Sequence, residues 1–172
     1  MPFSRDTISL AGEWRFSLDR ENEGIQKKWF EQKLADTITL PGTTDEAQKG
    51  DFVDEQCDNR LSRQWRWIGP AWYQKSLSIP EDWRDKRIML RLERTKDTQV
   101  WVDDIWIGSE DSLSTSHTFD LSEQLSPGSH TLTILVDNAK LPPVGPCHAV
   151  DERTQTNWNG IVGNIELTAS EK

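Results

Sequence analysis

Hydrophobic and polar residues alternate over several short segments of this 172-residue chain. Near the start, Trp14, Phe16 and Leu18 alternate with polar neighbours, which is typical of a strand with one buried face. The same period of two recurs in residues 72–79, 87–93, 129–136 and 161–168. The pattern predicts a fold built from many short β-strands.

Turn residues separate these segments at regular intervals. Asp103 and Asp104 lie between two short apolar runs and predict a hairpin with a two-residue turn. A short strand at 117–120, a helical turn at 121–125 and the Pro127-Gly128 turn follow. Many short strands separated by turns are typical of a sandwich or barrel, here one domain over residues 1–172.

Two segments depart from the strand pattern. Residues 24–34 place Ile25 and Trp29 at helical spacing, so we expect one short helix there. Residues 43–63 form a long polar segment with six acidic residues. A loop of about 20 residues is uncommon in a compact domain and is often functional or wraps a neighbour. A solvated surface loop is the alternative.

Composition narrows the class of partner. The nine tryptophans either pack in the core of a β protein or present flat faces to sugar rings, and composition does not separate these alternatives. The net charge of −9 argues against nucleic acid and anionic membranes. No segment is apolar enough to cross a bilayer. Without a hydrophobic signal core, we expect a cytoplasmic protein, or a periplasmic or secreted one if a signal was removed.

Catalytic and metal-binding motifs are absent from the sequence. It has no nucleophile elbow, no phosphate-binding glycine loop and no dinucleotide fingerprint. Turn formation accounts for the acidic pairs at 81–82 and 103–104. Cys57 and Cys147 match no zinc spacing, so they are either two free thiols or one bridge. We therefore expect no catalytic residues, no metal and no cofactor.

The richest polar constellation lies just before the last strand segment, where amide and acidic side chains surround one tryptophan. Amide side chains donate and accept hydrogen bonds, as sugar hydroxyls do. Such a loop suits a contact with a saccharide or with a partner domain. Alternatively, its side chains only form hydrogen bonds with the backbone of their own loop. The candidate residues are Asp151, Glu152, Thr154, Gln155, Asn157, Trp158 and Asn159.

An ordered series of short motifs resembles the N-terminal sugar-binding domain of glycoside hydrolase family 2, the β-galactosidase, β-glucuronidase and β-mannosidase group. The series covers residues 10–167 and reads GPAWYQK at 69–75, IPEDW at 79–83, KRI at 86–88, LERT at 92–95, VWVD at 100–103, FDL at 119–121, PG at 127–128, VDN at 136–138 and WNGI at 158–161. The resemblance implies a galactose-binding-like jelly-roll β-sandwich with one or two short helices.

The same resemblance implies a function without chemistry of its own. In that family an immunoglobulin-like domain and a TIM barrel follow, and the barrel carries two glutamates for retaining hydrolysis. This chain alone should be inactive and should help to shape the active site of its parent enzyme. The family commonly has an acidic sugar contact six positions before the glycine of the Gly-Ile pair, where this chain has Thr154.

Three functions follow as hypotheses. The first is an accessory domain that binds saccharide weakly in a shared site and packs against the downstream immunoglobulin-like and barrel domains. The second is a freestanding lectin-like module. The third is a structural or adaptor sandwich that uses a surface around Trp65 and Trp67.

Overall fold

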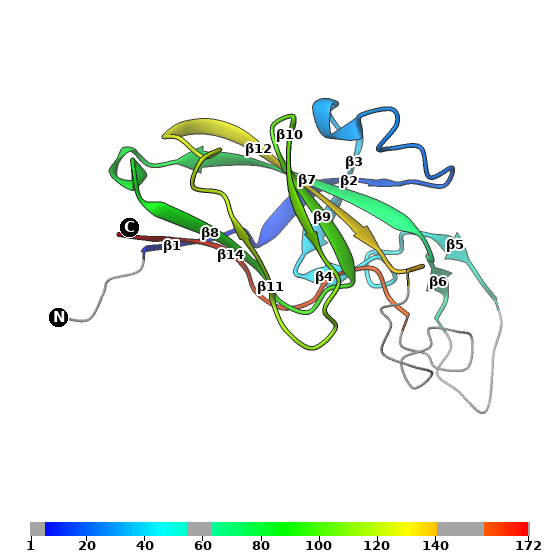
Figure 1. Cartoon of the computed structure of the whole chain (residues 1–172). Helices are drawn as coiled ribbons and strands as arrows, with labels where there is room; N and C mark the ends of the chain where they lie inside the picture. Colours follow the sequence, from blue (N-terminus) through cyan, green and yellow to red (C-terminus); the bar gives the residue numbers. More distant parts are fainter. Residues whose placement is uncertain (1–5, 55–62, 141–156, 172) are drawn as a thin grey trace.

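Two antiparallel β-sheets packed face to face make up the computed structural model, which describes residues 6–54, 63–140 and 157–171 (Figure 1). The smaller sheet has four strands. In spatial order these are β1 (Asp6–Ser9), β14 (Ile165–Ser170), β8 (Arg87–Leu92) and β11 (His117–Asp120).

The larger sheet has six strands, and two short ribbons lie outside both sheets. In spatial order its strands are β10 (Ile105–Glu110), β9 (Asp97–Val102), β12 (Gly128–Asp137), β7 (Pro70–Ile79), β2 (Gly12–Leu18) and β3 (Asp36–Leu40). The ribbons pair β13 (Gly160–Ile161) with β4 (Gly42–Thr43), and β5 (Asp51–Phe52) with β6 (Trp65–Arg66).

The main core lies between the two sheets and follows from the alternation in the sequence. Phe16 and Tyr73 from the larger sheet and Leu90 and Leu167 from the smaller sheet are all buried in it. Strands β7 and β12 pair over their full ten residues in the middle of the larger sheet. The predicted all-β jelly-roll sandwich is confirmed, as is the hairpin at Asp103-Asp104. The last predicted strand segment, 161–168, is instead divided between the short strand β13 and the strand β14.

A second, smaller core lies on the outer face of the larger sheet. Trp72, Trp101, Leu135 and Leu34 are buried there, and Trp29 and Phe30 pack against them. The ring of Phe30 stacks on that of Trp101 with 5.2 Å between centroids. The segment between β2 and β3 therefore covers this face of the sheet.

The helix predicted over residues 24–34 is reduced to a single 3-10 turn, Trp29–Glu31, and a second 3-10 turn spans Glu81–Trp83. The carboxylate of Asp19 accepts the backbone N–H of Gly24 at 2.8 Å and the indole N–H of Trp72 at 3.0 Å. A Cβ at Gly24 would lie 2.5 Å from the Trp72 indole nitrogen. Anchoring of this segment to the tryptophans thus takes precedence over its helical spacing.

The polar segment at 43–63 is more ordered in its described part than a plain loop. It begins within β4, and the hydroxyl of Thr43 and the carboxylate of Glu46 hydrogen-bond at 3.1 Å across the turn that follows. Phe52 in β5 then contacts Trp65 in β6, with 5.3 Å between ring centroids. The uninterrupted loop of the prediction is corrected here, since pairing to β13 and β6 gives the segment its own structure.

Candidate functional site

The structure describes three of the seven residues predicted for the site. Asn157, Trp158 and Asn159 lead into β13. The other four, Asp151, Glu152, Thr154 and Gln155, lie outside the described residues, as do Cys57 and Cys147. The site is therefore built from what surrounds residues 157–161.

Close backbone packing fixes the position of this segment. Gly160 has φ of +139°, and a Cβ on it would lie only 2.2 Å from the carbonyl oxygen of Gly42. Only glycine allows β13 and β4 to approach this closely. The Thr95 hydroxyl donates to the Gly160 carbonyl at 2.9 Å, and the Thr44 N–H donates to the Asn159 carbonyl at 2.9 Å.

Asn159 points into the protein and is fully buried, with 0% exposed area. Its side-chain oxygen Oδ1 accepts a hydrogen bond from the Tyr73 hydroxyl at 2.7 Å. Its side-chain nitrogen Nδ2 donates to the backbone carbonyls of Gly69 and Val136 and to Asn138 Oδ1. Burial raises the pKa of Tyr73 well above its ordinary value, and the charge of Asp45 adds to the effect. The hydroxyl therefore stays a donor, and Asn159 holds the segment in place.

Asn157 lies two residues earlier and is only partly satisfied. Its Oδ1 accepts the Asn138 amide at 2.8 Å, and its backbone carbonyl accepts the Arg63 guanidinium. Among the described residues, Asn157 Nδ2 and Asp45 Oδ1 are buried without a hydrogen-bond partner. Arg63 links the two, since its Nη1 lies 3.7 Å from Asp45 Oδ1. Asn157 and Asp45 thus contact the same Arg63 guanidinium, and each keeps one buried polar atom without a hydrogen bond.

Trp158 is half-buried beside a lysine. The Lys96 ammonium lies 4.6 Å from the centroid of the indole ring, a distance typical of a cation–π contact. Burial lowers the pKa of Lys96, and the positive charge of Arg63 lowers it further. One face of the indole is therefore occupied by a cation from this chain.

An apolar patch lies next to these polar groups. Trp67 is joined to the site because its carbonyl accepts the Asn138 amide at 2.9 Å. Its neighbour Ile68 is 54% exposed, and Phe52 on the β5–β6 ribbon is 57% exposed. Ile68 and Phe52 are thus two exposed apolar side chains on the segments that adjoin the site.

Sequence reasoning missed the residues that complete the site. Asp45 and Arg63 come from the two ends of the polar segment 43–63, and Lys96 and Asn138 come from two other parts of the chain. Only the fold brings these four residues to Asn157 and Trp158. Of these residues, Asn138 could have been suspected from the sequence, because a polar side chain that directly follows a buried strand lies at the end of the sheet. Within residues 6–54, 63–140 and 157–171, no group of acidic, histidine or cysteine side chains is placed to hold a metal. No helix in these ranges could span a membrane.

Comparisons with known proteins match this architecture. A β-glucuronidase of Paenibacillus borealis is 30% identical over 154 residues, which is 83% of this chain and 24% of that protein. A β-glucuronidase of Formosa agariphila is 22% identical over 129 residues, 74% of this chain and 13% of that protein. This chain thus spans at most about a quarter of the curated relatives it matches.

Solved structures share the fold. A β-glucuronidase of an uncultured Clostridium superposes with a TM-score of 0.77 at 23% identity, over 98% of this chain and 30% of that one. The apo structure of a Ruminococcus gnavus β-glucuronidase gives 0.76 at 22% identity, over 99% and 30%. The sequence model of the glycosyl hydrolases family 2 sugar binding domain matches residues 7–170. With nearly every described strand inside that match, the chain belongs to the sugar-binding domains of glycosyl hydrolase family 2.

Proposed function

We propose that this chain is a non-catalytic wall of a saccharide site, which it shares with a catalytic barrel of a larger family 2 glycosidase. The observation that carries the proposal is the pair of unbonded polar atoms, Asn157 Nδ2 and Asp45 Oδ1. Buried polar groups in native proteins are nearly always hydrogen-bonded, so an exception requires an explanation. A sugar hydroxyl accepts from an amide and donates to a carboxylate, so it suits both atoms.

The surroundings of this pair support a site completed by another domain. The apolar patch at Trp67, Ile68 and Phe52 borders the polar groups, as expected where a second domain packs beside a shared cleft. The matched region makes up 24% of one relative and 13% of the other, which leaves room for that domain. We also propose Asp151, Glu152, Thr154 and Gln155 for the same wall, on the sequence pattern alone.

The first experiment measures turnover of aryl β-glucuronide, β-galactoside and β-mannoside by the purified 172-residue chain. The relatives named above are β-glucuronidases, so the glucuronide is tested first. We expect no hydrolysis by this chain and activity only when it is joined to the downstream polypeptide. Turnover by the isolated chain would overturn the proposal.

The second experiment tests the shared wall in the complete parent enzyme. Replacing Asn157 by Ala should raise KM for the aryl glycoside about tenfold, because one hydrogen bond to the sugar is lost. Thr37→Val, at an exposed position on β3, is the control and should leave KM unchanged. Tight sugar binding by the isolated chain that is lost in Trp158→Ala would instead favour a freestanding lectin-like module.

A further inference from the structure

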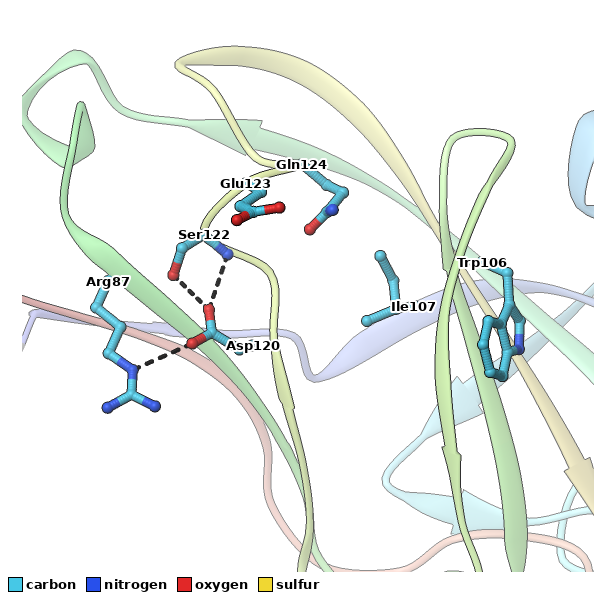
Figure 2. A pocket seen from close by; sticks show the side chains of 7 residues that line it. All are labelled: Arg87, Trp106, Ile107, Asp120, Ser122, Glu123 and Gln124. Atoms are coloured by element: carbon cyan, nitrogen blue, oxygen red, sulfur yellow. Dashed lines mark hydrogen bonds and ion pairs between the residues drawn. The ribbon is translucent and has the colours of Figure 1, made fainter.

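A second cavity lies at the other end of the sandwich from Asn157. Arg87 lines it and is the first residue of β8, whereas Thr95 and Lys96 of the candidate site follow the last residue of that strand. The cavity has a volume of about 510 Å³, within the range of small-molecule sites. Figure 2 shows Glu123 and Gln124 after β11 on one side and Ile107 and Trp106 from β10 on the other.

The edge strands of the two sheets form this cavity. Strand β10 is the edge of the larger sheet and β11 the edge of the smaller one. They come close at Gly108, where an added Cβ would lie 3.8 Å from the Phe119 ring. The sheets therefore close on each other at that point, and the cavity opens beside it.

A β-bulge shapes the β10 side of the cavity. Trp106 pairs with Trp101 and Gly108 with Val100, so Ile107 is an extra residue without a partner on β9. Consecutive side chains of a regular strand point to opposite faces, and a bulge changes that direction locally. Figure 2 shows Ile107 and Trp106 on opposite sides of β10: Ile107 packs against the main core, whereas Trp106 pairs with Trp101 and is 56% exposed. Both residues contribute to the lining of the cavity at this edge of the sheet.

Polar groups on the opposite side are held on a well-anchored segment. The buried Leu121 and Leu125 fix it, with the Leu125 N–H bonded to the Leu121 carbonyl at 3.0 Å. Ser122 accepts the Ile88 N–H at 2.9 Å and donates to the Asp120 carboxylate. The cavity wall is thus part of the fold.

The charges in the cavity are mostly compensated. Arg87 Nε lies 3.2 Å from Asp120 Oδ2, so this cation already has an anion beside it. Hydrogen bonds from Ser122 lower the pKa of Asp120, which keeps the pair charged. Among the described residues, the side chains of Glu123 and Gln124 and the indole N–H of Trp106 have no hydrogen-bond partner. The remaining charge is that of Glu123, which disfavours an anionic ligand.

We propose that this cavity binds a neutral saccharide through Trp106, Ile107, Glu123 and Gln124. The exposed indole of Trp106 suits the C–H face of a sugar ring, since an aromatic face attracts the positive edge of C–H groups, and Ile107 adds an apolar wall on the inner side of β10. Glu123 and Gln124 supply acceptors and a donor for the hydroxyls. A protein partner is a poorer fit, because protein interfaces are broader and their centres lack charged groups.

The test titrates the 172-residue chain with cellopentaose, xylopentaose and mannopentaose, by calorimetry and by NMR of the indole N–H signals. We expect at least one of them to bind and to shift the Trp106 signal. Trp106→Ala should weaken that binding about tenfold or more, as for loss of a stacking ring. Ile105→Ala is the matched control, since Ile105 is an exposed neighbour that does not line the cavity.

Each of the other results overturns the proposal. These are no binding of any probe at its solubility limit, binding unchanged in both Trp106→Ala and Gln124→Ala, and binding of tetragalacturonate as tight as that of the neutral sugars. Loss of binding in Asn157→Ala but not in Trp106→Ala would place the sugar at the other end. Weakened association of Trp106→Ala with the downstream polypeptide, without sugar binding, would make this surface a protein interface.

Discussion

Asn157 and Asn159 are two residues apart, yet their side chains are in opposite situations. The Asn159 amide is fully buried, and both of its polar atoms are hydrogen-bonded, to Tyr73 on β7, Val136 on β12, Gly69 and Asn138. The Asn157 amide keeps a buried nitrogen without a partner among the described residues. Satisfied buried polar groups stabilise a unique structure, whereas an unsatisfied one lowers stability. The Asn159 side chain therefore serves the fold, whereas the Asn157 side chain keeps the unbonded atom on which the proposed function rests.

Gly160→Ala is expected to reduce stability the most, because it disturbs the packing of β13 against β4, which positions both asparagines. The new Cβ would meet the Gly42 backbone at a backbone angle that strains any other residue. We expect a loss of about 4 kcal/mol in the free energy of unfolding, measured by urea denaturation.

Gly128→Ala separates the two causes of that loss. Gly128 also has positive φ, but nothing lies within 4 Å of its added Cβ. Strain alone should reduce stability by about 1–2 kcal/mol. Equal losses at the two glycines would show that the close approach of β13 to β4 is unimportant.

The pair of variants Asn159→Ala and Asn157→Ala tests the comparison directly. The first leaves the Tyr73 hydroxyl and the Gly69 and Val136 carbonyls without their partner, so we expect a loss of about 3 kcal/mol. Asn157→Ala removes the Oδ1 that accepts a hydrogen bond from Asn138, but it also removes the buried Nδ2 that has no partner. Because these two changes offset each other, the free energy of unfolding should change by less than about 1 kcal/mol. Urea denaturation of both variants measures the difference, and equal losses would contradict the assignment of roles.

Alkaline pH should weaken the Asn159 network through Tyr73. The folded-state pKa of this hydroxyl is raised, so its contribution is complete below the unfolded value and is lost as pH rises. Above about pH 10 we expect the free energy of unfolding to fall by about 1.4 kcal/mol per pH unit. Tyr73 is the one tyrosine of the chain, so tyrosinate absorbance reports on it alone.

The control for this pH effect is Tyr73→Phe. It should be less stable at neutral pH, because the hydroxyl bond to Asn159 is absent. Its stability should also depend less on pH in the alkaline range. An equal slope in both proteins would assign the alkaline loss to other groups.

Thr95→Val should have a small effect on stability. It removes the buried hydroxyl that donates to the Gly160 carbonyl and keeps the side-chain volume, so we expect a loss of about 1 kcal/mol. Thr37→Val is the matched control at an exposed position and should change stability very little. Thermal unfolding of both variants checks this, and an equal change in the two would show that the Thr95 bond adds nothing.

Much of the fold could be predicted because strand periodicity is a local property. The alternation at Leu132, Ile134 and Val136 placed β12, and Asp103-Asp104 placed the β9–β10 turn. The helix at 24–34 was wrong in extent because Trp29 and Phe30 bind to tryptophans on distant strands. Local spacing carries no information about such partners.

The candidate site was only partly predictable for the same reason. The run of amides around Trp158 predicted a site in the segment that leads into β13, but the sequence could not tell that the Asn159 side chain turns inward. Asp45 and Arg63 come from the polar segment, where their residue types are ordinary for a surface. Their relation to Asn157 arises only when β4 pairs with β13.

The position of β14 in the smaller sheet also constrains the order of events during synthesis. This strand lies between β1 and β8, so residues 6–9 have no partner until residues 165–170 have left the ribosome. Contacts between such distant segments form slowly. The inner faces of the sandwich therefore stay incompletely covered until residues 165–170 have been synthesised, and a chaperone that holds the nascent chain in this interval would raise the yield of folded protein.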